Sequence, residues 1–229
     1  MSSVIKTNDL KKYYNPGESL EVRALDGISI DIERGEFTAI VGPSGSGKTT
    51  LLNIIGGLDK QTNGTAHIAE TEITALSDND LIDFRLKNIG FVFQAYNLIP
   101  VLTAKENVEF IMLLQNRPKT ERDSRTEELL QEVGLGDKMN NKPTELSGGQ
   151  QQRVAVARAL ASKPQFVLAD EPTANLDSQS TADLLDTMAE LNKKEDVTFL
   201  FSTHDQRVID RARRVITLED GKIISDVRK

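Results

Sequence analysis

Short apolar runs and amphipathic stretches alternate along this chain of 229 residues. Alternating apolar and polar positions over residues 25–32 predict a half-buried strand. The nearly continuous apolar run over 37–42 predicts a strand that is covered on both faces. A helix is expected from residue 48 to about 55, and the two glycines at 56–57 end it. The start of the chain is therefore β-rich, and its first helix follows a buried strand.

The middle of the chain carries helical patterns. Thr103 and Glu106 have the spacing of a capping box, which opens a helix that reaches about residue 115. Two further helices are expected over 121–133 and 149–161, and the second of them stops before Pro164. This stretch predicts a block of helices inserted between strands.

The last part of the chain returns to alternating strands and helices. Buried strands over 165–170 and 197–204 flank a helix from 178 to about 192, and residues 215–225 predict a hairpin. Alternation of this kind is typical of an α/β fold with a parallel sheet. We therefore predict one domain, in which a core made of residues 1–94 and 163–229 is interrupted by a helical subdomain over 95–162.

Composition narrows the classes of function. The formal net charge of −7 argues against a non-specific nucleic-acid binder, which needs a basic field. The absence of cysteine excludes disulfides, thiolate zinc sites and cysteine nucleophiles. The N-terminus lacks the apolar core of a signal peptide, and the most apolar stretch, 108–114, is too short to cross a membrane. Any role at a membrane is expected to depend on a partner.

A glycine-rich stretch, GPSGSGKT, fits the phosphate-loop pattern G-x-x-x-x-G-K-[ST] between a predicted strand and a predicted helix. Its glycines allow several backbone N–H groups to point at one phosphate. Lys48 supplies a mobile positive charge to the outer phosphates, and the Thr49 hydroxyl suits Mg²⁺. The residues expected to bind the phosphates are Gly42, Pro43, Ser44, Gly45, Ser46, Gly47, Lys48, Thr49 and Thr50.

Polar side chains end three other predicted strands. Asp170 is expected to bind Mg²⁺ through water, and Glu171 to act as the general base on an attacking water, because adjacent side chains point different ways. Gln94 ends the strand GFVFQ and is expected to touch metal and water. His204 ends another strand and is expected to hydrogen-bond the terminal phosphate. The carboxyl ends of parallel strands meet at the edge where open α/β sheets bind ligands.

A second anion site is expected at LSGGQ, residues 146–150, where a serine and two glycines open a helix. The ordered set GPSGSGKT, GFVFQ, LSGGQ, FVLADE, NLD and STH resembles the ATP-binding-cassette (ABC) ATPases over essentially the whole chain. The resemblance implies a P-loop NTPase (RecA-like) core with an antiparallel β subdomain and an inserted helical subdomain. It also implies ATP hydrolysis, with ATP and Mg²⁺ bound.

In that family two subunits pair head to tail, and the LSGGQ signature of each covers the nucleotide of the other. The resemblance therefore implies an ATP-dependent dimer with a second copy of the chain. Asp177 is implied to line the dimer seam, and Tyr14 to stack on adenine, with Tyr13 as an adjacent competitor. The residues implied to contact the partner's γ-phosphate are Ser147, Gly148 and Gly149, and Gln150 is expected to take part in binding the nucleotide.

Two longer stretches, 90–108 and 169–180, are similar to the ATPases of lipoprotein release, macrolide export and cell division, with Ala174 where members commonly carry glycine. This implies a transporter subunit held at the cytoplasmic face of the inner or plasma membrane by integral membrane permease subunits, with no nucleic-acid partner. The implied cargo is a lipoprotein or a hydrophobic or peptide-like substrate. The alternative is a non-transporting, cell-division-type complex that activates an envelope partner. The apolar residues within 95–106 are expected either to meet the permease or to pack on the helical block.

Overall fold

The structure is a computed structural model that describes residues 2–17 and 19–229. The chain divides into two compact units, one formed by Met1–Arg85 with Thr198–Lys229 and the other by Leu86–Val197. The helical insertion expected over 95–162 lies inside the second unit. Within the described ranges, no helix combines the length and the apolar character that a bilayer span requires.

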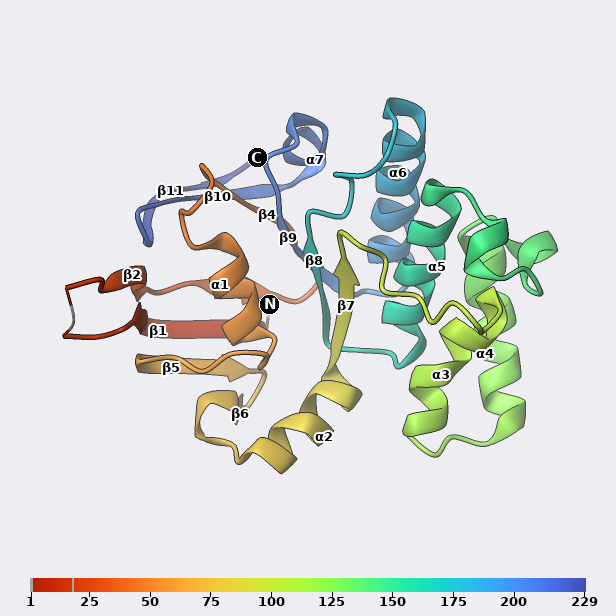
Figure 1. Ribbon diagram of the computed structural model, residues 1–229, viewed down its shortest axis with the longest axis horizontal. Coiled ribbons are helices and arrows are strands. Elements are labelled where there is room, and N and C mark those ends of the chain that lie inside the picture. The colour runs from red at the N-terminus through yellow and green to blue at the C-terminus, as the bar shows by residue number, and fades with distance from the viewer. Residues whose placement is uncertain (1, 18) are drawn as a thin grey trace. The chain divides into compact units, whose positions relative to one another are not determined.

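An antiparallel sheet forms the N-terminal part of the first unit (Figure 1). Its strands are β2 (Val22–Ile28), β1 (Ser3–Tyr14), β5 (Asn63–Ile68) and β6 (Thr71–Glu72) in this order, and β3 (Asp31–Glu33) pairs with β1. The single strand predicted over 25–32 is wrong, because the chain breaks between β2 and β3. The buried Thr7 hydroxyl occupies the break: it donates to Ile28 O at 3.0 Å and accepts from Ile30 N at 3.1 Å. A side chain thus replaces the backbone partner that a continuous strand would have used.

A second set of strands in the first unit is mostly parallel. The set consists of β4 (Phe37–Val41), flanked by β9 (Thr198–Ser202) and β10 (Arg214–Glu219), and β11 (Lys222–Arg228), which pairs antiparallel with β10. Asp220 and Gly221 join β10 to β11 with φ angles of 46° and 73°, as the hairpin prediction requires. Phe37 and Phe201 pack with ring centroids 4.5 Å apart in the core. The buried strands predicted around 37 and 197 are therefore confirmed.

Three helices accompany these strands, and two of them, those over 78–88 and 206–211, were not predicted. The helix α1 (Lys48–Ile55) has the predicted bounds; Gly56 is its C-cap, and the next residue, Gly57, has a φ of +63°. The helix α7 (Gln206–Arg211) follows β9. The helix α2 (Asp78–Asn88) was missed, because Leu81 is its only buried residue and its polar sequence has no apolar stripe. The pattern of hydrophobic residues therefore carries no signal for α2.

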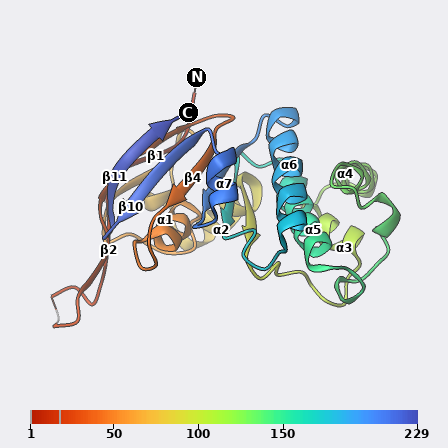
Figure 2. The ribbon, with the colours of Figure 1, turned by 90° about the horizontal axis from the view of Figure 1, so that it is seen from above.

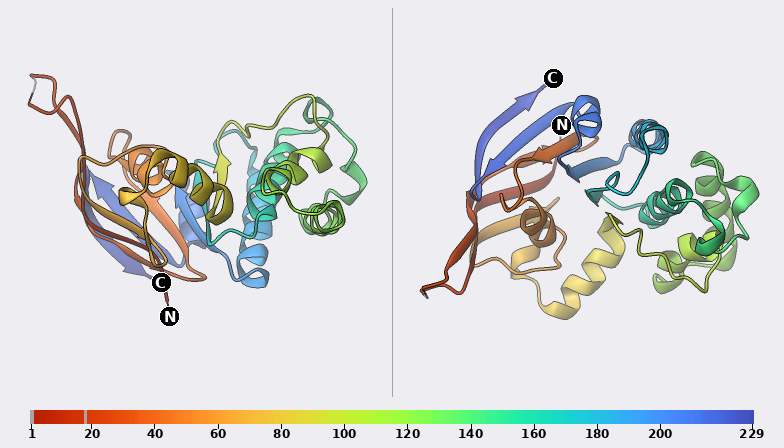
Figure 3. Two further views of the ribbon diagram at one scale, coloured as in Figure 1. Left: turned by 90° about the horizontal axis from the view of Figure 1, so that it is seen from below. Right: turned by 45° about the horizontal axis from the view of Figure 1, so that its top comes forward.

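The second unit combines two parallel strands with a group of helices (Figures 2 and 3). The strands are β7 (Ile89–Phe93) and β8 (Phe166–Asp170), and the helices are α3 (Ala104–Leu114), α4 (Lys119–Glu132), α5 (Gly148–Ala161) and α6 (Ser178–Lys194). The capping box at the start of α3 is confirmed: Thr103 Oγ1 accepts from Glu106 N at 3.2 Å, and Thr103 N donates to Glu106 Oε2 at 2.8 Å. The expected helices are all present, with ends that differ from the predictions by a few residues.

A buried ion pair joins three helices of the second unit. Arg125 of α4 is 7% exposed and donates to Glu195 Oε2, just beyond α6, at 2.7 Å. The same guanidinium donates to Leu160 O of α5 at 3.3 Å. The hydrogen bond from Arg125 to Glu195 holds the pKa of the Glu195 carboxyl below its ordinary value. Arg125 therefore connects α4 with the last turn of α5 and the end of α6.

Candidate functional site

The loop between β4 and α1 adopts a backbone that requires glycine. Gly42 has a φ of +150°, and a Cβ there would lie 2.0 Å from Leu218 O. Gly47 has a φ of +102°, and a Cβ there would lie 2.3 Å from Ala24 O. Both positions therefore exclude any side chain, by conformation and by space. The tight curl of the predicted phosphate loop follows from these two glycines.

The interior of this loop carries a cation and a buried hydroxyl. Lys48 Nζ donates to Gly42 O at 2.8 Å and to Pro43 O at 2.9 Å. Ser46 is 2% exposed, and its Oγ has no hydrogen-bond partner among residues 2–17 and 19–229. A cation bound only by neutral carbonyls gains energy when an anion approaches it. The positive charge, the buried hydroxyl and the N-terminus of α1 together fit a phosphate group.

His204 follows the end of β9, next to the phosphate loop that follows β4. Ser202, the last residue of β9, pairs in register with Ile40 of β4, and Thr203 N donates to Ile40 O at 3.1 Å. The exposed His204 therefore follows β9 at the same edge where Gly42 follows β4. The structure thus brings together the residues predicted to bind phosphate in the first unit.

Tyr13 and Tyr14 point to opposite faces of β1 and have different surroundings. Tyr14 is 42% exposed, its hydroxyl lies 3.1 Å from Asp59 Oδ2, and Lys12 Nζ lies 4.9 Å from its ring centroid. The Tyr13 hydroxyl donates to Asp26 Oδ1 at 2.6 Å, and this hydrogen bond raises the pKa of the Tyr13 phenol. Tyr14 is the more exposed of the two rings, and the choice of Tyr14 for adenine remains a prediction.

Three of the predicted metal and base residues, Gln94, Asp170 and Glu171, lie at the carboxyl ends of β7 and β8 in the second unit. Phe93 pairs in register with Asp170, so that Gln94 and Glu171 are the next residues on neighbouring strands. Glu171 has a φ of +46°, a left-handed conformation that is uncommon for a residue other than glycine. Strain of this kind persists where the surrounding structure enforces it, and it is frequent at functional sites. The backbone turn at Glu171 is therefore a constrained feature of this edge.

The LSGGQ segment forms the start of α5 with a capping box that we did not predict. Ser147 Oγ accepts from Gln150 N at 3.3 Å, and Ser147 N donates to Gln150 Oε1 at 2.9 Å. The S-x-x-Q spacing in the sequence carries this signal. A hydroxyl that accepts in this way can still donate its own proton. The cap and a contact with phosphate are therefore compatible roles for Ser147.

The start of α5 packs directly on the start of α6. A Cβ on Gly149 would lie 3.0 Å from Ser180 Cβ, so glycine allows the close approach of the two helices. Asp177 is the N-cap of α6: it accepts from Ser180 N at 2.9 Å and from Ser180 Oγ at 2.7 Å, and these bonds lower its pKa. The signature and the NLD segment, which are far apart in the sequence, thus share Ser180. Sequence alone carries no signal for this contact.

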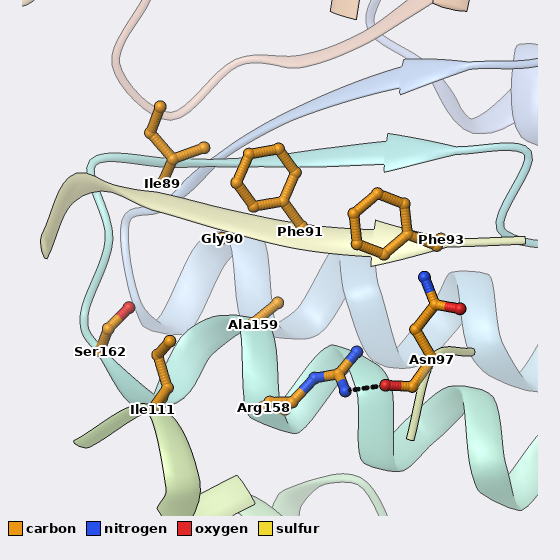
Figure 4. A pocket seen from close by; sticks show the side chains of 9 residues that line it. All are labelled: Ile89, Gly90, Phe91, Phe93, Asn97, Ile111, Arg158, Ala159 and Ser162. Carbon is orange, nitrogen blue, oxygen red and sulfur yellow. Dashed lines mark hydrogen bonds between the residues drawn. The ribbon is translucent and has the colours of Figure 1, made fainter. Parts of the chain in front are cut away.

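The loop that follows Gln94 lies beside a pocket between β7, α3 and α5 (Figure 4). Arg158 of α5 donates to Asn97 O at 2.5 Å and to Tyr96 O at 2.9 Å. Burial lowers the pKa of the Arg158 guanidinium. The residues that line the pocket are Ile89, Gly90, Phe91, Phe93, Asn97, Ile111, Arg158, Ala159 and Ser162.

The expectation that the apolar residues of 95–106 pack on the helical block is confirmed for part of the loop, and the contact with a permease stays a prediction. The buried side chain of Asn107 donates to the carbonyls of Ile99 and Leu102, each at 3.1 Å, and it secures the loop on α3. Ile99 and Leu102 are half-buried by this packing. Val101 is 71% exposed. The loop therefore packs on the helical block and still presents an apolar side chain to the outside.

The difference between two glycines of the phosphate loop gives a direct test of the loop. Gly47→Ala combines an unfavourable φ with a clash against Ala24 O, whereas Gly45→Ala has a φ of +80° and no atom within 4 Å. We expect Gly45→Ala to cost about 1–2 kcal/mol and Gly47→Ala about 1–3 kcal/mol more. Urea unfolding of both variants measures the difference. Equal stabilities would contradict the loop geometry.

Comparison with known proteins places the chain in a large group of relatives. Residues 25–174 match the family described as ABC transporter. The chain is 48% identical over 224 residues to the lipoprotein-releasing system ATP-binding protein LolD 1 of Rhodopseudomonas palustris, covering 97% of this chain and 99% of that protein. It is 49% identical over 223 residues to the macrolide export ATP-binding/permease protein MacB of Hyphomonas neptunium, covering 97% of this chain. The chain spans only 34% of the length of that MacB.

A solved structure has the same fold. The ATP-binding cassette MJ0796, in a dimeric post-hydrolysis state bound to ADP and Pi, superimposes with a TM-score of 0.88 at 43% identity. The match covers 98% of each chain. The predicted fold class, a P-loop core with an antiparallel β subdomain and an inserted helical subdomain, is confirmed by this likeness.

Proposed function

This chain belongs to the ABC transporter family as an ATP-hydrolysing cassette related to LolD and MacB, and we propose that it drives a membrane permease in lipoprotein release or in the export of a hydrophobic or peptide-like substrate. The observation that carries the proposal is the glycine-enforced phosphate loop with Lys48 inside it. The identity of 48% to a LolD supports lipoprotein release, and the identity of 49% to a MacB supports export.

In the first unit, the phosphate loop holds the nucleotide. Lys48 exchanges its bonds to the carbonyls of Gly42 and Pro43 for the outer phosphates of ATP, because charged acceptors bind an ammonium more strongly than neutral ones. His204 hydrogen-bonds the terminal phosphate, and Tyr14 stacks on the adenine. All of these residues bind and orient ATP before the chemistry begins.

The groups that act on water belong to the second unit, and the proposed metal ligands are Thr49 of the first unit and Gln94 and Asp170 of the second. Glu171 takes the proton of the attacking water, and Gln94 orients that water. Thr49, Gln94 and Asp170 offer hydroxyl, amide and carboxylate oxygens, the hard ligands that Mg²⁺ prefers. When bound, Mg²⁺ supplies positive charge to the phosphate oxygens. In the proposed division of the chain into a core of 1–94 and 163–229 and a helical subdomain of 95–162, all of these residues belong to the core.

The signature segment closes the site from a second copy of the chain. Ser147, Gly148, Gly149 and Gln150 contact the γ-phosphate held by the partner, and the N-terminus of α5 adds a favourable dipole. Asp177 lines the seam between the two copies. ATP therefore draws the head-to-tail dimer together, and hydrolysis removes the γ-phosphate charge that held it closed. The dimer reported for the related cassette supports this arrangement.

The closing dimer acts on permease subunits at the cytoplasmic face of the inner or plasma membrane, with no nucleic acid involved. The exposed Val101, next to the loop of Gln94, offers an apolar contact for such a permease. In the alternative proposal, the membrane partner transports nothing and instead activates an enzyme of the cell envelope.

Affinity capture of the chain from detergent-solubilised membranes tests the proposal. The Glu171→Gln variant with ATP serves as bait, and the matched control is the same bait without nucleotide. We expect a polytopic membrane protein to co-purify in the presence of ATP. Recovery of DNA or ribosomes instead would overturn the transporter assignment, and a partner that binds an envelope enzyme would favour the alternative.

A further inference from the structure

One buried glutamine on α5 bridges two backbone positions of the site. Gln152 is 0% exposed, and its Nε2 donates to Pro172 O at 2.8 Å and to Phe93 O at 3.3 Å. Phe93 is the residue before Gln94, and Pro172 is the residue after Glu171. A single amide group therefore holds both segments that carry the groups acting on water.

The strand register explains why one side chain reaches both carbonyls. Phe93 at the end of β7 pairs with Asp170 at the end of β8, so the two chains leave the sheet side by side. The Gln152 Oε1 has no hydrogen-bond partner in the part of the chain that the structure describes. The side chain therefore contributes here through its two N–H donors. Among side chains of this size, only an amide presents two uncharged donors on one atom.

Two other contacts secure the same loop. Arg158, also on α5, donates to Asn97 O (Figure 4) and to Tyr96 O. Asn175, in the turn after Glu171, donates through Nδ2 to Gln94 O at 3.0 Å. The loop of Gln94 is thus attached at several carbonyls to α5 and to the turn of Glu171. These hydrogen bonds connect the loop of Gln94, the start of the turn at Glu171 and α5 to one another.

We propose that Gln152 is a positioning residue for ATP hydrolysis, which fixes Gln94 and Glu171 relative to each other and to the helix that begins with the signature. The inference rests on the proposed roles of Gln94 and Glu171. Gln152 itself touches neither nucleotide nor water. It acts on the rate of the chemical step, because a catalytic base that is misplaced by about 1 Å can lose roughly 100-fold in rate.

The test is a comparison of kcat with ATP affinity in Gln152→Met, which keeps the length of the side chain and removes both donors. We expect kcat to fall roughly 10- to 100-fold. We expect KM for ATP, and the affinity for a fluorescent ATP analogue, to stay within about twofold, because Lys48 and its loop are untouched. Rates are measured at increasing protein concentration, so that dimerisation does not limit them. Gln152→Glu, whose carboxylate only accepts, should show the same loss.

Asn192→Leu is the matched control, because Asn192 is a second buried amide of this unit and donates to Val197 O at 2.6 Å. It should lower the unfolding temperature and leave kcat unchanged. An unchanged kcat in Gln152→Met, a parallel loss of ATP affinity, or failure of both Gln152 variants to fold where Asn192→Leu folds would each overturn the inference. Unchanged hydrolysis in Glu171→Gln would overturn the proposed function and this inference with it.

Discussion

Replacement of Glu171 by glutamine is expected to lower kcat for ATP hydrolysis by about 10²- to 10⁴-fold, the typical contribution of a positioned general base. An amide has nearly the same shape as the carboxylate and cannot accept the proton of the attacking water. Binding of ATP should remain, because the phosphate loop and Lys48 lie at a different part of the sequence and keep their hydrogen bonds. The variant should therefore accumulate with ATP bound as a closed dimer.

The measurement combines phosphate release with gel filtration in the presence of ATP and Mg²⁺. Glu190→Gln is the control, because Glu190 is an exposed carboxylate on α6. This variant should hydrolyse ATP at the wild-type rate. Normal hydrolysis by Glu171→Gln would remove Glu171 as the base. A monomeric Glu171→Gln protein in ATP would contradict the dimer that ATP holds together.

Mixing two inactive variants is expected to restore hydrolysis. Lys48→Ala removes the cation of the phosphate loop, and Ser147→Arg places a bulky side chain at the start of α5. In a homodimer of either variant, both composite ATP sites are inactive. In an equal mixture, each heterodimer regains one intact site, built from the phosphate loop of one copy and the signature of the other. About a quarter of the wild-type sites should then be active, if the copies pair at random in a two-fold dimer.

The two variants measured separately, at the same total concentration, are the controls for this experiment. Ser147 also caps α5, and loss of such a cap costs about 1 kcal/mol, so thermal unfolding must first establish that Ser147→Arg is folded. Restored hydrolysis in the mixture alone supports contact of the signature with the partner's nucleotide. A mixture that stays as inactive as its components would contradict that contact.

Local sequence rules predicted the elements whose signals lie within a few residues. The helix α1 begins at Lys48 and ends where two glycines follow, and α3 begins with the capping box of Thr103 and Glu106. The turn at Asp220 and Gly221 also agrees. Local rules did not predict the helix α2, because it buries only Leu81. They also did not predict the break between β2 and β3, because the distant Thr7 side chain provides the hydrogen bonds there.

In the candidate site, too, some features could be predicted from local sequence and others could not. The identity of the phosphate loop follows from sequence, because Gly42 and Gly47 are needed for φ angles that other residues rarely adopt. The role of Gln152 could not be foreseen from its place in the repeated glutamines of LSGGQQQR. Its two acceptors, Phe93 O and Pro172 O, lie 59 and 20 residues away in the sequence. A pairing over such distances depends on how β7, β8 and α5 pack.

The sequence by itself determined the family, the phosphate loop, the signature and most of the helices, because these depend on backbone conformation, capping and apolar periodicity within short segments. The tertiary structure alone decided which distant groups touch: Gly149 against Ser180, Arg125 with Glu195, and Gln152 between the strand ends that lead to Gln94 and Glu171. These contacts arise from packing and strand register, which bring together residues that no local pattern connects.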